Sequence, residues 1–136
     1  MLDDNRINLA KYRLERALQC LESADALLSI EDFKGAANRS YYAIFHAMRT
    51  IFALDGLDFK KHSGLISEFR KRYIKSGLLS EKLSDIINEL FQVRIDSDYD
   101  DFYLISHDEV KEQIQNAYDF IKSIRGYLHT QLPSAF

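Results

Sequence analysis

The chain has 136 residues, of which 46% are hydrophobic, and its formal net charge is −3. This length and composition predict one domain over residues 1–136, with enough apolar material for a core. The mild charge gives no global argument for a nucleic-acid partner, and the one cysteine, Cys20, excludes an internal disulfide. Because there is no apolar run of about 18 residues and no signal-peptide pattern, we expect a cytoplasmic protein without a membrane span.

Helical periodicity dominates the first half of the chain. Apolar residues recur at steps of three and four over about residues 4–29, and again on one face of residues 32–54. Asp32 is of the type that caps a helix N-terminus, and Gly56 is typical of a helix end. We therefore expect two long helices here, with Cys20 on the core face of the first.

The second half of the chain predicts three further helices. A short one is expected over about residues 63–75. Ser80 is expected to cap a fourth, which decays into the acidic run at residues 96–101, and the spacing of Ser106 and Glu109 predicts a capping box before the last helix. The inward face of that helix is expected to hold Val110, Ile114, Ala117, Tyr118, Ile121, Ile124 and Leu128. Since no segment alternates convincingly with period two, the fold class is all-α, an up-and-down bundle of four to five helices.

Polar side chains line up along the second expected helix. Their spacings of four, three, four and three residues place them on one stripe: Gly35, Arg39, Tyr42, His46 and Arg49. Arg39 and His46 are seven residues apart, so they return to nearly the same angle about two turns along the axis. A guanidinium suits a phosphate and an imidazole moves protons near neutral pH, so the pair suits two parts of one phosphodiester. A solvated face, or a polar seam against a neighbouring helix, would show the same spacing.

Three other charged segments give weaker signals. Residues 60–64 read Lys-Lys-His-Ser-Gly; with Lys61 and His62 they could receive an anion at a helix start, or they are simply a hydrophilic turn. The basic run 70–72 complements the dipole at the end of its helix. The acidic run 96–101 lacks the glycine and the ligand spacing of a calcium loop, so we expect no metal site. The sequence shows neither a phosphate-binding glycine loop nor the usual zinc-protease and hydrolase motifs.

Three blocks taken together resemble the HEPN domain family (higher eukaryotes and prokaryotes nucleotide-binding), most of all its small stand-alone prokaryotic branch. They are residues 39–49 (RSYYAIFHAMR), 60–64 (KKHSG) and 94–99 (RIDSDY), in that order. The resemblance covers nearly the whole chain. It implies a helical bundle that pairs as a homodimer and acts with a minimal nucleotidyltransferase as a toxin–antitoxin-like system. Active members of the family are metal-independent RNases whose motif is an Arg, four to six intervening residues and a His, with two copies meeting in the dimer cleft.

The family motif fits this sequence imperfectly. Its usual place, in the later helices, points to Arg94, but the residues at motif spacing there are Tyr99, Asp100 and Asp101, and none of them is a His. The literal match, Arg39 to His46, lies on the second helix. Either a catalytic site is rebuilt from Arg39, His46, Arg94 and Tyr99, or this branch has lost RNase activity and Arg94 remains with Asp98 as an ion pair or a nucleotide contact.

Two function classes stay open from the sequence. One is an interaction module, a HEPN subunit that binds its nucleotidyltransferase partner and holds nucleotide or RNA in a dimer cleft through Tyr42, Lys61, His62 and Asp98. The other is an endoribonuclease toxin that the partner restrains. A purely structural interaction module is a further alternative, and in every case we expect no cofactor. Aromatic side chains on exposed faces favour the homodimer. The aromatics expected there are Tyr41 or Tyr42, Phe59 and Phe102.

Overall fold

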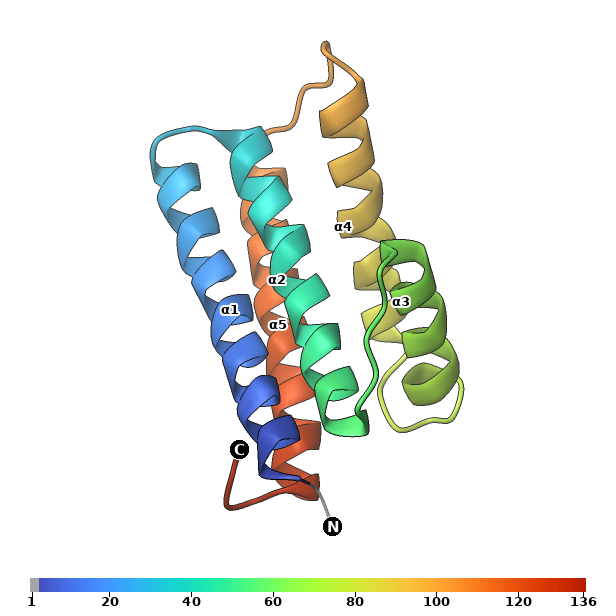
Figure 1. The fold of residues 1–136 in the computed structure, drawn as a ribbon. Helices are drawn as coiled ribbons and strands as arrows, with labels where there is room; N and C mark the ends of the chain where they lie inside the picture. Colours follow the sequence, from blue (N-terminus) through green and yellow to red (C-terminus); the bar gives the residue numbers. More distant parts are fainter. Residues whose placement is uncertain (1–2) are drawn as a thin grey trace.

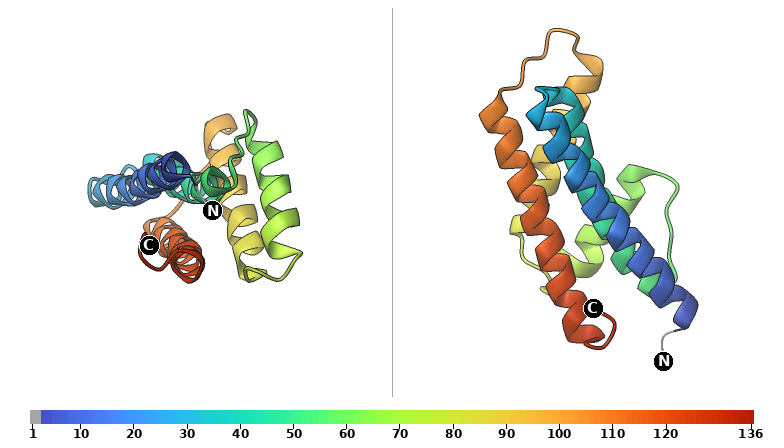
Figure 2. Two further views of the ribbon diagram at one scale, coloured as in Figure 1. Left: turned by 60° about the horizontal axis from the view of Figure 1, so that its bottom comes forward. Right: turned by 90° about the vertical axis from the view of Figure 1, so that its left-hand side faces the viewer.

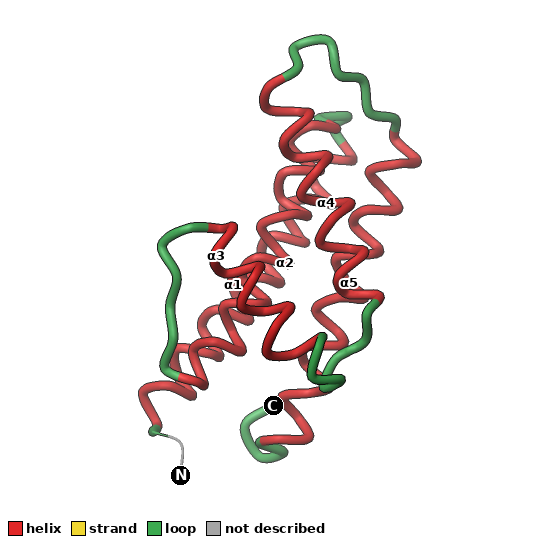
Figure 3. The backbone as a smooth tube through the Cα atoms, turned by 90° about the vertical axis from the view of Figure 1, so that its right-hand side faces the viewer, coloured by secondary structure: helices red, strands yellow, loops and turns green. Residues whose placement is uncertain are grey.

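The computed structural model describes residues 3–136, and within that range it contains helices and no strand (Figure 1, Figure 3). The helices are α1 (Asp4–Ser29), α2 (Phe33–Asp55), α3 (His62–Phe69), η1 (Arg70–Ile74), α4 (Lys82–Tyr99) and α5 (His107–Gln131). The element η1 is one π-helical turn that continues α3. The all-α class predicted from the sequence is confirmed.

Helix α2 lies at the centre of the bundle. It contacts α1, α3, α4 and α5, with α1 and α5 on one side of it and α3 and α4 on the other (Figure 2). The helices α1, α2, α4 and α5 alternate in direction, and α3 lies in the connection between α2 and α4 (Figure 1). A helix surrounded in this way must be apolar on most of its faces, so any polar side chain that it carries is conspicuous.

Local capping explains where the long helices begin and end. The Asp32 carboxylate accepts a hydrogen bond from the Gly35 backbone N–H at 3.0 Å, which satisfies one of the free donors at the start of α2. Gly56 ends α2 at a φ of 72°, a left-handed conformation that favours glycine. At the start of α5 the Ser106 hydroxyl accepts from the Glu109 N–H at 3.1 Å and donates to the Glu109 carboxylate at 3.2 Å. The predicted N-cap at Asp32, the predicted helix end at Gly56 and the predicted capping box of Ser106 and Glu109 are confirmed.

The third and fourth helices differ from the sequence prediction at their ends. The third helix does not stay α-helical to residue 75, because the Lys75 N–H donates to the Arg70 carbonyl, five residues back, at 2.8 Å. The fourth does not decay at residue 96 but runs to Tyr99. Side-chain pairs four residues apart support this last stretch, since Gln92 donates to Asp96 at 2.9 Å and Arg94 lies 3.8 Å from Asp98.

The core fills the space around α2 with large side chains. Tyr41, Phe52, Phe69 and Phe120 are all fully buried. Helical spacing also predicts Tyr41 on the core face of α2, and this prediction is confirmed, so of the two alternatives Tyr41 and Tyr42 the exposed aromatic is not Tyr41. Phe102 is 90% exposed, as expected. None of the helices within residues 3–136 is long and apolar enough to cross a lipid bilayer.

Two further positions refine the expected core. Cys20 is buried on α1, as predicted. The inward placement of Tyr118 is wrong, because this side chain is 50% exposed. Phe120 takes the inward position instead, since it follows Ala117 by three residues and precedes Ile124 by four.

Candidate functional site

The polar stripe of α2 is the part of this central helix that neighbouring helices leave accessible. The α2 side chains that pack against the other helices are buried, whereas Tyr42, His46 and Arg49 are half-buried and Arg39 is exposed. The stripe predicted from residue spacing therefore exists as a surface. Its chemistry depends on what α1, α3 and α4 place beside it.

Helix α4 brings Arg94 over the tyrosines of α2. The Arg94 Cζ atom lies 5.1 Å from the ring centroid of Tyr41 and 5.5 Å from that of Tyr42, and its Nη2 donates to the Tyr42 hydroxyl at 3.3 Å. Cation–π attraction and this hydrogen bond fix the plane of the guanidinium. Asp98 lies 3.8 Å from Nε, which is buried and has no hydrogen-bond partner within residues 3–136. Arg94 is thus held in place while part of its hydrogen-bonding capacity is unused.

The first residue of α3, His62, closes the other side of this aromatic group. Its ring stacks on Phe45 with centroids 4.0 Å apart, and its Nδ1 lies 2.8 Å from the Tyr41 hydroxyl. Burial, then the charges of Arg94 and Arg49, lower the pKa of His62, and burial raises the pKa of Tyr41 to about 12. At neutral pH both groups are therefore uncharged, and the Tyr41 hydroxyl can donate to the imidazole.

His46 sits between the aromatic group and a group of arginines. Its ring centroid is 5.8 Å from that of Phe45 and 6.4 Å from that of Tyr42. Burial lowers the pKa of His46 to about 4, with smaller contributions from four arginines. These are Arg49, Arg16, Arg13 and Arg39. His46 is neutral near pH 7, and its Nδ1 is buried without a hydrogen-bond partner in the described part of the chain.

Two of these arginines share one carboxylate. Arg13 of α1 and Arg49 of α2 each place a guanidinium nitrogen 3.5 Å from the carboxylate of Asp58, in the connection between α2 and α3. Arg13 also donates to the Arg49 carbonyl at 3.2 Å, and its side chain is only 9% exposed. Burial and the neighbouring Arg49 lower the pKa of Arg13. One carboxylate leaves these two cations, one buried and one half-buried, short of negative charge.

We call this surface the basic-aromatic face. It comprises Arg13, Arg16, Arg39, Tyr42, His46, Arg49, Asp58, His62, Arg94 and Asp98. It holds five arginines and two carboxylates in a chain whose net charge is −3. Positive charge is thus concentrated on one face, as anion binding requires.

The structure brings together most of the side chains that the sequence singled out. Tyr42, His62, Arg94 and Asp98 are connected by hydrogen bonds, ring contacts and an ion pair, and His46 adjoins Tyr42. Arg39 is exposed and acts on His46 through its charge.

Two of the predicted site residues lie apart from this group. Tyr99 is 82% exposed at the end of α4, and Lys61 is exposed as the N-cap of α3; within residues 3–136 neither makes a side-chain hydrogen bond or ring contact with the group.

Sequence reasoning missed Arg13 and Asp58 as parts of the site. A signal for Arg13 exists, because it falls three residues after Ala10 and four before Ala17, within the apolar spacing of α1. An arginine at a core position needs an oppositely charged or hydrogen-bonding group beside it. Asp58 has no comparable signal, because its position depends on how the connection after α2 folds back. Within residues 3–136 no group of three or more His, Cys, Asp or Glu side chains is arranged to hold a metal ion.

Comparison with known proteins decides the family. The family model of the HEPN domain matches residues 10–127, which is most of the chain. The chain belongs to the HEPN domain family. Its blocks at residues 39–49 and 94–99 supply Tyr42, His46, Arg49, Arg94 and Asp98 of the basic-aromatic face, so the family resemblance and this surface coincide.

Relatives of this HEPN protein occur in bacteria and archaea. A "UPF0332 protein" of Thermotoga maritima is 33% identical over 116 residues, covering 85% of this chain and 88% of the relative. "Putative toxin MJ0142" of Methanocaldococcus jannaschii is 30% identical over 115 residues, covering 85% and 78% of the two chains. "Putative toxin MJ0605" of the same organism is 31% identical over 86 residues, covering 63% and 64%.

Proposed function

We propose that this HEPN protein binds RNA or a nucleotide through its basic-aromatic face, as one subunit of a toxin–antitoxin-like pair with a minimal nucleotidyltransferase. The observation that carries the proposal is Arg94, whose guanidinium lies over two tyrosine rings and is held there by one hydrogen bond to the Tyr42 hydroxyl and an ion pair with Asp98. The toxin names of the two M. jannaschii relatives support the toxin-like part.

The chemistry of the face suits a phosphodiester strand. Arginine offers a planar, permanently charged donor set for phosphate oxygens, and neutralising phosphates supplies much of the affinity of such complexes. Single-stranded RNA also presents bases that stack on aromatic rings and on guanidinium planes. Tyr42 and Arg94 provide both kinds of surface within 5.5 Å of each other.

A metal-independent endoribonuclease is the second candidate, favoured by His46, a half-buried neutral imidazole beside arginines. A neutral imidazole can take the proton of an RNA 2′-hydroxyl while the 2′-oxygen attacks phosphorus. The bond between phosphorus and the 5′-oxygen then breaks, the 5′-oxygen takes up a proton from water, a 2′,3′-cyclic phosphate remains, and the arginines stabilise the developing charge. A pKa of about 4 makes His46 a weak base. A phosphate bound at the arginines would raise the pKa of His46, because its negative charge favours the protonated imidazole.

Pairing with a second copy and with the nucleotidyltransferase is part of the proposal. The end of α4 and the connection that follows it support the proposal, because Tyr99, Phe102 and Leu104 are 82%, 90% and 89% exposed. Three large apolar side chains in six residues are more than a solvated loop needs. Light scattering that gives the mass of one chain would contradict the homodimer, and failure to co-purify with a nucleotidyltransferase encoded beside the gene would contradict the pairing.

Binding is tested by fluorescence anisotropy with a labelled single-stranded RNA. Arg94→Ala should weaken binding by about fivefold or more, the effect of losing one charged hydrogen-bonding group. Arg125→Ala is the matched control, because Arg125 is exposed on α5 outside the basic-aromatic face. If both variants lose the same RNA affinity, the loss is explained by the change in net charge alone, and the proposal is contradicted.

Catalysis is tested separately by incubating RNA with the protein in EDTA. The endoribonuclease candidate predicts cleavage that His46→Ala and Arg94→Ala abolish. If no cleavage occurs at high protein concentration, or if both variants cleave as well as the original chain, the catalytic candidate fails and the binding proposal stands on its own test.

A further inference from the structure

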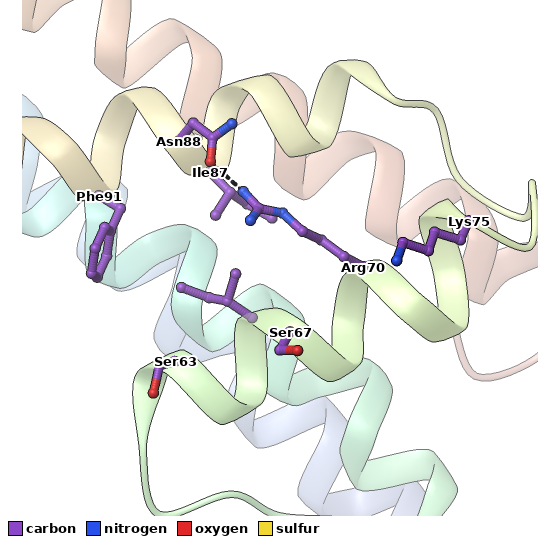
Figure 4. A pocket seen from close by; sticks show the side chains of 8 residues that line it. Ser63, Ser67, Arg70, Lys75, Ile87, Asn88 and Phe91 are labelled. Atoms are coloured by element: carbon purple, nitrogen blue, oxygen red, sulfur yellow. Dashed lines mark hydrogen bonds between the residues drawn. The ribbon is translucent and has the colours of Figure 1, made fainter.

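A pocket separate from the basic-aromatic face lies between the α3–η1 segment and α4. Its volume is about 400 Å³, within the range of small-molecule sites. Arg70 and Lys75 line it together with Ser63 and Ser67, and Phe91 stands across from them on α4 (Figure 4). No carboxylate is among the described residues that line it.

The π-helical turn η1 explains why two cations share this pocket. The Lys75 N–H donates to the Arg70 carbonyl at 2.8 Å, so the residues five apart lie one turn above each other. In an α-helix, five residues would rotate the second side chain by about 140° from the first, away from the pocket. Single π turns are rare in proteins, but those that do occur often lie at functional sites. Here the irregular turn places a second positive charge beside the first.

Arg70 is positioned across the pocket by α4. Its Nη2 donates to the Asn88 side-chain oxygen (Figure 4) and, at 3.4 Å, to the Ser84 carbonyl. Its Nε is buried and has no hydrogen-bond partner in the part of the chain that the structure describes. Within the same residues, neither Arg70 nor Lys75 forms an ion pair with a carboxylate. The pocket therefore carries two positive charges without a counterion.

We propose that this pocket binds a small phosphate monoester that carries a flat ring. A phosphate monoester has a charge between about −1.5 and −2 near pH 7, which matches two cations better than the single charge of a carboxylate. Ser63 and Ser67 also line the pocket, and a serine hydroxyl is a neutral hydrogen-bond donor for a phosphate oxygen once its side chain turns toward it. The ring lies against Ile87 and Phe91, which form the apolar wall. This inference goes beyond the proposed function, since it needs neither RNA binding nor a partner protein.

The two sites share a wall. The Phe91 ring lines the pocket on one side and lies 5.8 Å, centroid to centroid, from the buried Tyr41 ring on the other. Tyr41 in turn contacts Arg94 and His62. Occupation of the pocket should therefore be visible in the NMR signals of Ser63, Asn88 and Phe91, with smaller shifts at Tyr41.

The probe is phenyl phosphate, titrated into the full chain by isothermal calorimetry and by amide chemical-shift mapping. We expect binding with shifts at the pocket residues, and about fivefold to tenfold weaker binding by Lys75→Gln, since one charged hydrogen bond is lost. Arg72→Gln is the matched control, because Arg72 lies in the same π turn but pairs with Glu68 outside the pocket. This control should bind phenyl phosphate as the original chain does.

Three comparisons make the proposal refutable. No binding of phenyl phosphate at about 10 mM, or equal binding by Lys75→Gln and the original chain, overturns it. Benzoate that binds as tightly as phenyl phosphate overturns the assignment of phosphate, and inorganic phosphate that binds as tightly overturns the role of the apolar wall. Shifts confined to the basic-aromatic face would assign the binding to that surface instead. RNA titrations do not enter this test, so its failure is distinct from failure of the proposed function.

Discussion

Replacing Asp58 by asparagine should lower stability and raise RNA affinity at the same time. The Asp58 carboxylate lies 3.5 Å from guanidinium nitrogens of both Arg13 and Arg49, and Arg13 is nearly buried. Asp58→Asn keeps the shape of the side chain but leaves two close cations without their shared counterion. Their mutual repulsion then opposes folding, while the same uncompensated charge favours a phosphate at this place.

The expected loss of stability in Asp58→Asn depends on how deeply the ion pairs of Asp58 are buried. Removing one partner of a fully buried ion pair costs about 3–5 kcal/mol. The Asp58 side chain is 59% exposed, so solvent screens much of this interaction. We expect the free energy of unfolding to fall by about 1–2 kcal/mol, and RNA binding to tighten by about threefold to tenfold because one repulsive carboxylate is gone.

Urea unfolding and RNA anisotropy measure the two effects on the same preparations. Asp25→Asn is the matched control, because Asp25 is an exposed carboxylate of α1 and no ion pair of it occurs within residues 3–136. It changes the net charge equally and should leave the free energy of unfolding within about 0.5 kcal/mol. If Asp58→Asn is as stable as the original chain, or binds RNA more weakly, the account of the Arg13–Asp58–Arg49 group is refuted.

Three further predictions rest on other parts of the structure. Burial and nearby arginines lower the pKa of His46 from the ordinary 6.5 to about 4. As the pH is lowered, the unfolded chain therefore binds a proton at this histidine before the folded chain does, and the free energy of unfolding should decrease from about pH 6.5 down to about pH 4. His46→Gln should flatten that part of the profile in urea titrations at successive pH values; an unchanged profile would contradict the lowered pKa. Ser106→Ala should lower the free energy of unfolding by about 1 kcal/mol, because α5 loses its N-cap, whereas Ser123→Ala in the same helix should not lower it. Arg94→Lys should restore only part of the RNA affinity lost in Arg94→Ala, because lysine keeps the charge but not the planar group over the tyrosines; full recovery would leave charge as the sole contribution.

Periodicity and capping chemistry were enough to predict the bundle. The caps at Asp32 and Ser106 and the glycine at residue 56 act within a few residues of chain, so their sequence signals are local and reliable. The stripe on α2 was also visible, because helical spacing fixes which side chains share a face. What the spacing left open was whether this face is packed, solvated or part of a site.

The remainder depends on contacts between distant segments. Asp58 joins the site because the connection after α2 returns toward α1, and no pattern in residues 56–61 encodes that path. The segment at Arg70 was predicted as part of an ordinary helix, because residues 70–74 carry no sequence signal for the π turn that the structure has there. Tyr41 satisfied both a core pattern and a surface pattern, and only the placement of His62 and Phe91 around it decides for the core.

The central claim is that the basic-aromatic face is where RNA or nucleotide binds. Amide chemical-shift mapping with a short single-stranded RNA tests it most directly, because it locates the contact without relying on a variant. We expect the largest shifts at Tyr42, His46, Arg49, His62 and Arg94, and we expect RNA affinity to fall as the salt concentration is raised. Largest shifts in α5, or an RNA that binds equally well at high and low salt, would contradict it.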